Sequence, residues 1–484
     1  MLERGEDGEP LWLLEAESAD AIVGEDGSYG DLKGVVLTLY QDGRESITIT
    51  SETGWVHQAA ARFILEGDVL AKSADGRFSL TCGRISGSPE SGLLDASEQV
   101  VATADGMTLG PAGRARARFE TPGENEMNTA TAAAFILTSL VMQGGEAWTI
   151  TRDNGNLVIS GVTESNTLFE KGRPTTITLE GAPVQAVWKR EGLQLTGRSL
   201  VATFLNPEPE GPRSERLEEA TVKGGVTVVL AGRAGAEGVE SVGWTLNVQG
   251  SQASFSRKEA LIKIIGGVTA TSDHPIFGGA LKASSVEVRL DRAVLDREGR
   301  FEPVSMAAIG PGIEYEYSDE TTTLRASRLD RLEVSLGESP ETRLLAGEGS
   351  PFLLEFASST GAESLIVEGL QFTGTLGREV VDELETWRLL SGRFWGGVEV
   401  TVTGASDEEE PDAEARTWTI NIKCPEIRYD RRASTMELLG GVTITGDHEI
   451  IGRGGGTAYG PRAVITFRPD SFEPAGVWMG GGGD

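Results

Sequence analysis

The sequence predicts an all-β fold built from several units in tandem, and three observations support this prediction. The chain has 484 residues, and a usual domain size of about 150 residues suggests roughly three units. It contains 64 glycines, and its short runs rich in Thr and Val end at Asp-Gly or Gly-Gly pairs, as strands do at turns. A long internal repeat indicates that one unit has been duplicated.

The first unit contains successive runs of strand length. Gly34–Tyr40, Ser46–Thr50 and Phe63–Val69 are rich in apolar and β-branched residues. Turn pairs such as Asp42-Gly43 and Asp75-Gly76 follow the strands. This order predicts a meander of antiparallel strands.

Ala130–Met142 is nearly all apolar and interrupts this pattern. It is too short to span a bilayer, which takes about 20 residues, and two interpretations stay open. It fits a buried connector helix between two β units. It also fits the core of a signal peptide ending near Gly145-Glu146-Ala147, although positive charge is missing from its flank. Met1–Pro10 is polar and acidic and predicts no signal at the start.

The internal repeat follows Trp148. Three landmarks recur in the same order, 172 to 174 residues apart: Gly224-Gly225-Val226 as Gly396-Gly397-Val398, Trp244 as Trp418, and Gly266-Gly267-Val268 as Gly440-Gly441-Val442. The length change falls at Asp407–Asp412, which predicts a solvated loop rather than a cation site.

Alternation within each copy places apolar side chains on one face of the sheet. Such a face must be covered by another sheet or by a ligand. If two sheets splay apart, the space between them becomes a slot for an acyl chain, where each buried methylene contributes about 0.8 kcal/mol. The candidate slot residues are Phe63, Leu65, Val69, Val226, Val228, Ile262, Ile264, Val268, Val398, Val400, Met436, Leu438 and Val442.

Three arginines and two tryptophans are further binding candidates. Arg114, Arg116 and Arg118 alternate along one strand and therefore share a face. They are candidates for contacts to lipid phosphates, and a solvated strand face is the alternative. Trp244 and Trp418 fit either core packing or the mouth of a groove.

The histidines and cysteines predict structural roles. His274 and His448 each follow an aspartate at equivalent repeat positions, but one Asp-His pair supplies too few ligands for a closed metal site. A turn is expected there, with the aspartate bonded to local backbone. Cys82 and Cys424 are expected to be unpaired strand residues. No catalytic residue, cofactor or metal is predicted, since no nucleophile elbow or phosphate loop occurs.

Charge excludes one class of partner. The 43 Lys and Arg residues face 74 Asp and Glu residues, giving a formal net charge of −31. No nucleic-acid partner is expected, because phosphate neutralisation needs a basic surface.

The order of short blocks resembles a known family. Trp12–Glu17, Leu32–Val35, Leu39–Gly43 and Leu65–Val69, followed by a strand that ends at Leu109-Gly110, resemble the LptC family. The Gly-Gly-Val strand units beyond Trp148 are similar to the LptA/OstA family. An LptC-like protein normally begins with a membrane anchor, and the two types are ordinarily separate chains, so this sequence resembles a fusion of the two.

The resemblance implies open, boat-shaped β-jellyrolls stacked end to end. It implies a non-enzymatic periplasmic bridge that carries lipopolysaccharide or a similar lipid along an apolar groove. The expected partners are an inner-membrane transport ATPase complex and an outer-membrane translocon, with possible end-to-end self-association. The predicted boundaries are 8–122 for the LptC-like domain, 123–147 for the apolar connector or signal-like segment, 148–300 and 301–476 for two OstA-like units, and 477–484 for a Gly-rich tail.

Two rival hypotheses belong to other classes. The first is an envelope scaffold or surface protein whose apolar faces are simply closed cores. The second is a β-helix enzyme acting on polysaccharide, which the repeat disfavours, because β-helix coils repeat every 20 to 30 residues or so. Solvent accessibility at Ile264 and Leu438 separates an open slot from a closed core.

Overall fold

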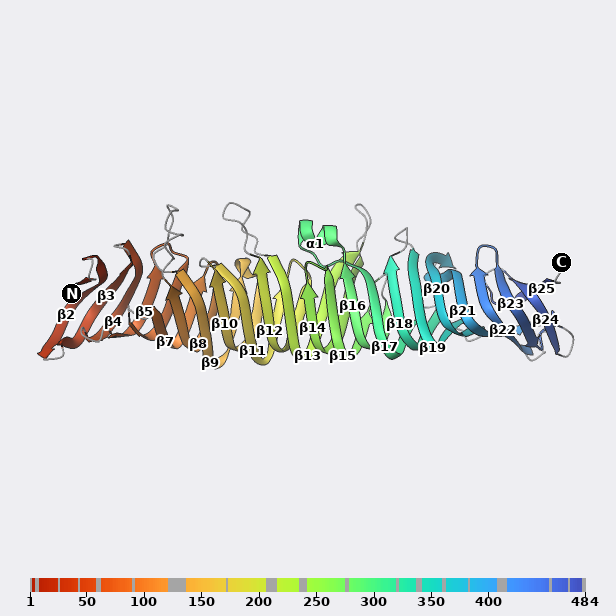
Figure 1. Cartoon of the computed structure of the whole chain (residues 1–484), viewed down its shortest axis with the longest axis horizontal. Helices are drawn as coiled ribbons and strands as arrows, with labels where there is room; N and C mark the ends of the chain where they lie inside the picture. Colours follow the sequence, from red (N-terminus) through yellow and green to blue (C-terminus); the bar gives the residue numbers. More distant parts are fainter. Residues whose placement is uncertain are drawn as a thin grey trace. The chain divides into compact units, whose positions relative to one another are not determined.

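The computed structural model confirms the all-β prediction. It describes residues 2–4, 8–24, 27–41, 44–57, 62–88, 92–120, 136–170, 173–205, 216–234, 242–274, 278–318, 322–336, 342–358, 363–381, 384–406, 416–451, 455–468 and 471–480. Nearly all of these residues lie in antiparallel strands, and the α-helix among them is the short α1 (Arg292–Glu298) (Figure 1). The acidic run Asp407–Asp412 lies outside the described residues.

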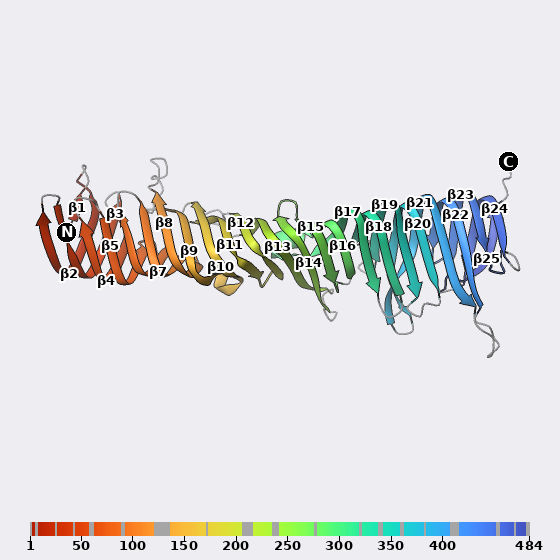
Figure 2. The same ribbon diagram turned by 90° about the horizontal axis from the view of Figure 1, so that it is seen from below.

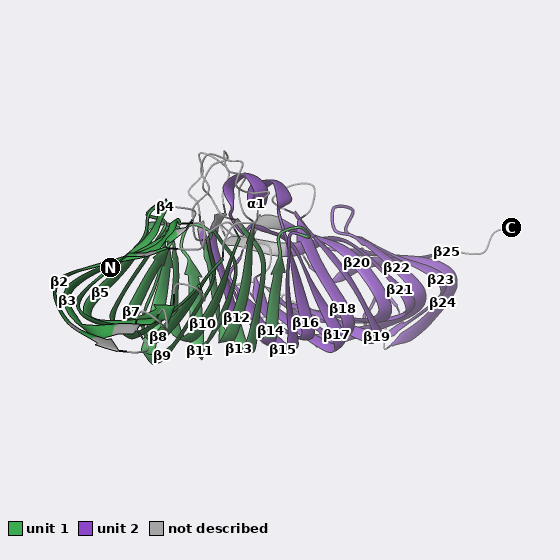
Figure 3. Ribbon diagram, turned by 60° about the vertical axis from the view of Figure 1, so that its left-hand side comes forward, with its two compact units in different colours: residues 1–227, 252–259 green, residues 228–251, 260–484 purple. Residues whose placement is uncertain are grey.

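The chain divides into two compact units (Figure 3). Unit 1 consists of Met1–Thr227 and Gln252–Glu259, and unit 2 of Val228–Ser251 and Ala260–Asp484. The division passes within two strands, β13 (Arg216–Ala234) and β14 (Val242–Ser256). The finer boundaries near residues 122, 147 and 300 stay a prediction.

Unit 1 is a meander in which each described strand pairs with the next one in sequence (Figure 2). Its strands are β1 (Leu2–Arg4), β2 (Pro10–Gly24), β3 (Gly27–Gln41), β4 (Arg44–His57), β5 (Arg62–Ser73), β6 (Phe78–Ser88), β7 (Leu93–Ala104), β8 (Met107–Glu120), β9 (Ile136–Arg152), β10 (Leu157–Glu170), β11 (Arg173–Trp188) and β12 (Leu193–Leu205). A single 3-10 turn, Asp153–Gly155, joins β9 to β10.

Unit 2 follows the same rule of sequential antiparallel pairing. Its strands are β15 (Leu261–Ser272), β16 (Gly279–Leu290), β17 (Pro303–Ser318), β18 (Thr322–Leu336), β19 (Thr342–Ser358), β20 (Ser364–Val381), β21 (Leu384–Ser406), β22 (Arg416–Asp430), β23 (Thr435–Gly446), β24 (Gly456–Phe467) and β25 (Pro474–Gly480).

The expectation of a connector helix within Ala130–Met142 is wrong for the part of that run which the structure describes. Residues from Ile136 onward form β9, which pairs with β8 and β10. Leu140 and Met142 point to the same buried face, two residues apart, as a strand requires. Residues 130–135 lie outside the described part.

A crease crosses nearly every long strand and explains the Gly-Gly-Val motif. The pairing register shifts between Ile265 and Val268 in β15, and between Leu439 and Val442 in β23. The two glycines inside each shift have positive φ, between 70° and 92°. Only glycine adopts such angles without strain, so the glycine pairs permit β-bulges that bend the strands.

The creases of neighbouring strands fall at corresponding places in the ladder, so each unit has two arms of sheet. In unit 1, arm 1A contains Leu109 and Ile150, and arm 1B contains Ala117 and Leu140. In unit 2, arm 2A contains Leu438, and arm 2B contains Val442. Most long strands of the ladder therefore supply both arms.

Candidate functional site

The inner faces of the arms are apolar in both units. All the candidate slot residues predicted from the sequence are buried on these faces. Phe63, Leu65 and Val69 lie in unit 1 on β5, whose register shift separates the first two from Val69. The alternation of apolar and polar residues therefore identified the buried face correctly.

In unit 2 the two arms face each other directly. One enclosed space is lined by arm 2B through Tyr315, Leu354 and Phe356 and by arm 2A through Phe372 and Leu389, with further apolar neighbours. Its free volume is about 10 Å³, which is room for roughly one water molecule. The interior of unit 2 is thus a tightly packed apolar interface whose two walls come from the two arms.

Ile264 and Leu438, the two positions chosen to separate an open slot from a closed core, are both fully buried, with 0% exposure. Both lie on arm 2A. In this structure solvent does not reach them. A lipid could reach them only after the arms have moved apart.

Ring contacts join the free ends of the arms. In unit 1, Phe78 of arm 1A meets Phe119 of arm 1B edge to face, with ring centroids 5.5 Å apart. The Arg152 guanidinium lies 5.1 Å from the ring centroid of Phe204, again between the two arms. In unit 2, Arg343 lies 5.8 Å from the ring centroid of Tyr317.

These contacts were not foreseen from the sequence. Each contact joins residues of different strands that lie close together only because the sheet bends at the crease. No local sequence pattern predicts such a contact. Aromatic pairs contribute about 0.5–1.5 kcal/mol, and cation–π contacts contribute about 0.5–1 kcal/mol at exposed sites and about 2 kcal/mol when desolvated, as at Arg343, which is buried. Ring contacts therefore bridge the ends of the two arms in both units.

The three candidate arginines lie on the outer face, away from the slot. Arg114, Arg116 and Arg118 are exposed, whereas the alternate residues of β8 are buried. Arg116 Nε lies 2.6 Å from Asp95 Oδ1. Arg114 and Arg116 border a shallow depression of about 540 Å³ on the outer surface of unit 1. The structure therefore places these arginines and the buried candidates on opposite faces of the sheet.

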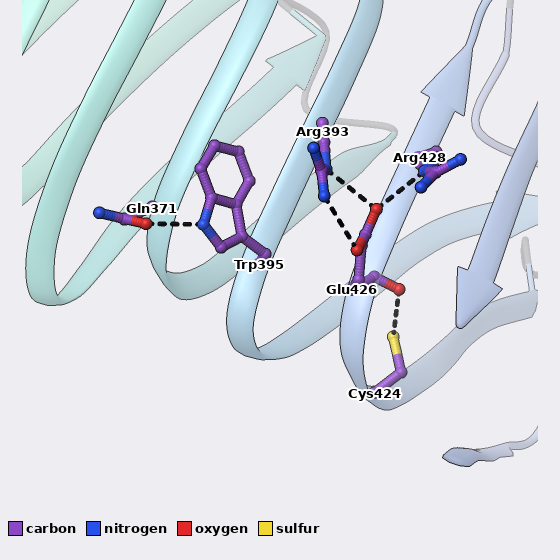
Figure 4. A network of polar contacts seen from close by, with 6 residues as sticks. All are labelled: Gln371, Arg393, Trp395, Cys424, Glu426 and Arg428. Atoms are coloured by element: carbon purple, nitrogen blue, oxygen red, sulfur yellow. Dashed lines mark hydrogen bonds and ion pairs between the residues drawn. The ribbon is translucent and has the colours of Figure 1, made fainter. Parts of the chain in front are cut away.

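Unit 2 carries an outer polar cluster that the sequence analysis missed (Figure 4). Glu426 accepts hydrogen bonds from Arg393 and Arg428, at 2.9 and 2.8 Å. These bonds hold the pKa of Glu426 below its ordinary value. Arg393 lies 5.1 Å from the ring centroid of Trp395, whose indole N–H donates to Gln371. No spacing rule joins these residues, because they come from three different strands.

The Asp-His pairs form a tertiary contact rather than the expected local turn bond. Asp273 Oδ1 accepts a hydrogen bond from the backbone N–H of Thr245, which lies 28 residues earlier, at 2.5 Å. The His274 ring packs edge to face on Trp244, with centroids 4.5 Å apart. Trp244 is buried, as core packing requires.

The second copy repeats this arrangement in full. Asp447 accepts from the Thr419 N–H at 2.6 Å, and His448 packs on Trp418 with ring centroids 4.9 Å apart. Trp418 is also buried. The two tryptophans therefore have matching surroundings, as duplication predicts.

The cysteines are buried, free thiols, as predicted. Cys82 and Cys424 stand at the register shifts of β6 and β22. Burial raises the pKa of each thiol to about 11, so both are protonated at neutral pH. Within the described residues, no group of three His, Cys, Asp or Glu side chains is placed to hold a metal ion.

A comparison with known families found a match for the first part of the chain. Residues 1–108 match the lipopolysaccharide-assembly, LptC-related family. The N-terminal part of the chain is LptC-like. This LptC-like part covers β1 to β7 and the start of β8. No curated protein matched the chain.

The family that this N-terminal part resembles is one of lipopolysaccharide assembly. The matching family consists of non-catalytic components of the cell envelope. Among the helices of the described residues, none has the length and apolar character needed to cross a bilayer.

Proposed function

We propose that the protein binds lipopolysaccharide, or a similar acylated lipid, between the two arms of its β units and carries it across the periplasm toward the outer membrane. The observation that supports this proposal is the interior of unit 2, where two apolar walls from opposite arms meet and would form a slot once they part. The LptC-like N-terminal part supports the same conclusion.

The energetics favour exchange of arm contacts for lipid contacts. Opening the arms breaks the ring contacts, each contributing about 1–2 kcal/mol, and separates the apolar walls that pack against each other. An acyl chain that buries a dozen methylenes gains about 10 kcal/mol at about 0.8 kcal/mol each. The inner faces stay covered in both states, by each other when empty and by the lipid when filled. The free energy gained by burying the lipid can therefore offset the free energy lost when the arms separate, without a large change in the sheets.

We also propose that the protein acts in the periplasm, between partners in the two membranes. A component of this kind receives lipid from an inner-membrane transport ATPase complex and delivers it to an outer-membrane translocon. End-to-end self-association would lengthen the path. The three arginines of β8, exposed on the outer face, are candidates for phosphate groups that remain outside the slot.

A scaffold with closed cores is the second candidate function. It is favoured by the complete burial of Ile264 and Leu438, which fits a core that never opens. The two functions predict different effects of charge on the inner face. In a slot that opens, a new carboxylate can reach water, whereas in a closed core it stays buried at a cost of several kcal/mol.

The test compares two adjacent isoleucines of β15. Ile264 is fully buried on the inner face, and Ile265 is 37% exposed on the outer face. Ile264→Asp should abolish binding of lipopolysaccharide in a pull-down assay and leave a folded protein. Ile265→Asp should bind like the wild type. Lipid binding that survives Ile264→Asp would contradict the slot, and unfolding of unit 2 by Ile264→Asp would favour the scaffold.

A further inference from the structure

Two hydroxyl groups lie on the inner face of unit 1 where apolar residues are expected. The buried positions of β10 after its crease are Ser165, Thr167 and Phe169. Ser165 and Thr167 are both 0% exposed. Neither Ser165 Oγ nor Thr167 Oγ1 has a hydrogen-bond partner among the described residues. A buried hydroxyl without a partner destabilises a fold, so its presence calls for an explanation.

The neighbours of these hydroxyls in the sheet offer no polar group. Ser165 lies between Met142 of β9 and Leu179 of β11 in the register. Thr167 lies between Leu140 and Ile177 in the same two strands. All four neighbours are buried, with exposures of at most 1%. The two hydroxyls therefore form a polar point within an apolar wall.

A third donor belongs to the same strand pair. Trp148 of β9 pairs with Val162 of β10, at the crease that precedes Ser165. Its indole Nε1 is buried and has no hydrogen-bond partner among the described residues. An indole N–H can only donate, and a hydroxyl can donate or accept. A ligand that satisfies all three groups must therefore present acceptor oxygens.

The apolar neighbours decide which acceptor fits. The in-sheet neighbours Leu, Met and Ile supply no counter-charge, so a phosphate or carboxylate at these positions would lose its hydration at a large cost. A carbonyl oxygen is neutral and accepts two hydrogen bonds. In an acyl ester or amide, the carbonyl group is joined directly to an alkyl chain. The apolar wall can cover that chain.

This inference rests on the proposed function: we propose that Ser165 and Thr167 donate the two hydrogen bonds that the ester or amide carbonyl of an acylated lipid accepts, while Trp148 donates to another oxygen of the same ligand. The rest of the slot is apolar and holds a chain at any depth, since the hydrophobic effect is not directional. The hydroxyls fix one carbonyl and so set the register of the acyl chain in unit 1. The ligand class is thus an acyl ester or amide, as distinct from an alkyl ether.

The test uses two probes that differ at a single group. One is a hexadecanoyl lysophosphatidylcholine, with an ester carbonyl, and the other is its hexadecyl ether analogue, with the same headgroup. Binding of each to the full chain is measured by isothermal titration below the critical micelle concentration. We expect the ester to bind about tenfold more tightly, since one or two hydrogen bonds discriminate the probes. In the double variant Ser165→Ala/Thr167→Val this preference should disappear while the ether binds as before.

A matched control and a stability measurement complete the design. Thr163→Val removes an exposed hydroxyl of the same strand and should keep the preference for the ester. The double variant should melt at a higher temperature than the wild type without lipid, because two unpartnered hydroxyls are gone. Equal binding of both probes by the wild type would overturn the inference and leave the proposed function standing. Preference for the ester that survives in the double variant would also overturn it, and failure of both probes to bind would overturn inference and function together.

Discussion

The two copies of the repeat each place the same local arrangement in unit 2, in different electrostatic surroundings. In each copy a histidine packs edge to face on a tryptophan, and an aspartate binds the backbone N–H that follows that tryptophan. Every group in this arrangement lies inside the repeat. Duplicating the sequence therefore duplicated the geometry.

The surroundings of the two histidines differ. Burial, followed by the nearby charge of Arg343, lowers the pKa of His274 to about 4. Burial also lowers the pKa of His448, but Glu449 and Glu473 act in the opposite direction. Arg343 belongs to β19, between the landmarks of the two copies. Local geometry follows the repeated sequence, whereas the charge environment depends on residues that are not repeated.

The largest expected effect tests whether the copies are equivalent. Trp244→Ala and Trp418→Ala each remove a buried indole, and each should cost about 3–5 kcal/mol of unfolding free energy. Because the two rings have matching neighbours, the two costs should agree within about 1 kcal/mol. Urea denaturation of the full chain measures both, and a larger difference would break the equivalence.

The pH dependence of stability sharpens the difference between the copies. The pKa of His274 is about 4 when folded and 6.5 in its ordinary state, so the unfolded chain takes up the proton first as pH falls. The contribution of His274 is complete above pH 6.5 and is lost as pH falls toward 4, up to about 3 kcal/mol.

His274→Gln should remove most of this loss, as measured by denaturation midpoints between pH 7 and pH 4. His448→Gln is the matched variant in the second copy, and it should flatten the profile in the same direction without the contribution of Arg343. An unchanged profile in His274→Gln would show that this imidazole is not held neutral.

A smaller effect is expected at the glycines that lie over the tryptophans. A Cβ atom at Gly232 would overlap the ring of Trp244, and one at Gly404 would overlap the ring of Trp418. Gly232→Ala and Gly404→Ala should therefore each cost about 1–3 kcal/mol through overpacking. A double-mutant cycle with Trp→Phe at the matching position should recover part of this cost, and strict additivity would contradict the overlap.

The smallest effect concerns the aspartates. Asp273→Ala and Asp447→Ala each remove one acceptor from a backbone N–H and should cost about 0.5–1.5 kcal/mol. Asp273→Asn and Asp447→Asn keep an acceptor oxygen and should stay close to the wild type. Thermal melts of the four variants distinguish these outcomes, and equal costs for Ala and Asn would argue against the hydrogen bond.

The sequence predicted the strands and the buried faces but not the crease. Ile264 and Val268 have the same parity along the chain and both point inward, whereas Gly266 between them is exposed. The sequence alternation therefore gives no sign of the bend, which the positive φ of the glycines allows. The Gly-Gly pairs were recognised as a repeat landmark, yet their mechanical role appears only in three dimensions.

The candidate site shows the same limit. The burial of the candidate slot residues followed from alternation, which is a local property. The contact of Arg343 with Tyr317 depends on how two arms meet, and no spacing encodes it. Ser165 and Thr167 did carry a signal, since they occupy inward positions of an alternating strand. Hydroxyls at apolar positions are a pattern that a search for catalytic motifs does not detect.

The central claim is that lipid enters between the arms, and adjacent leucines of β23 test it most directly. Leu438 is fully buried on the inner face, and Leu439 is partly exposed on the outer face. A diazirine analogue of leucine at either position preserves the shape of the side chain. After incubation with lipopolysaccharide and illumination, the account predicts a covalent lipid adduct from position 438 and none from position 439. Absence of an adduct at position 438 in a protein that melts like the wild type would contradict the slot and leave a closed scaffold.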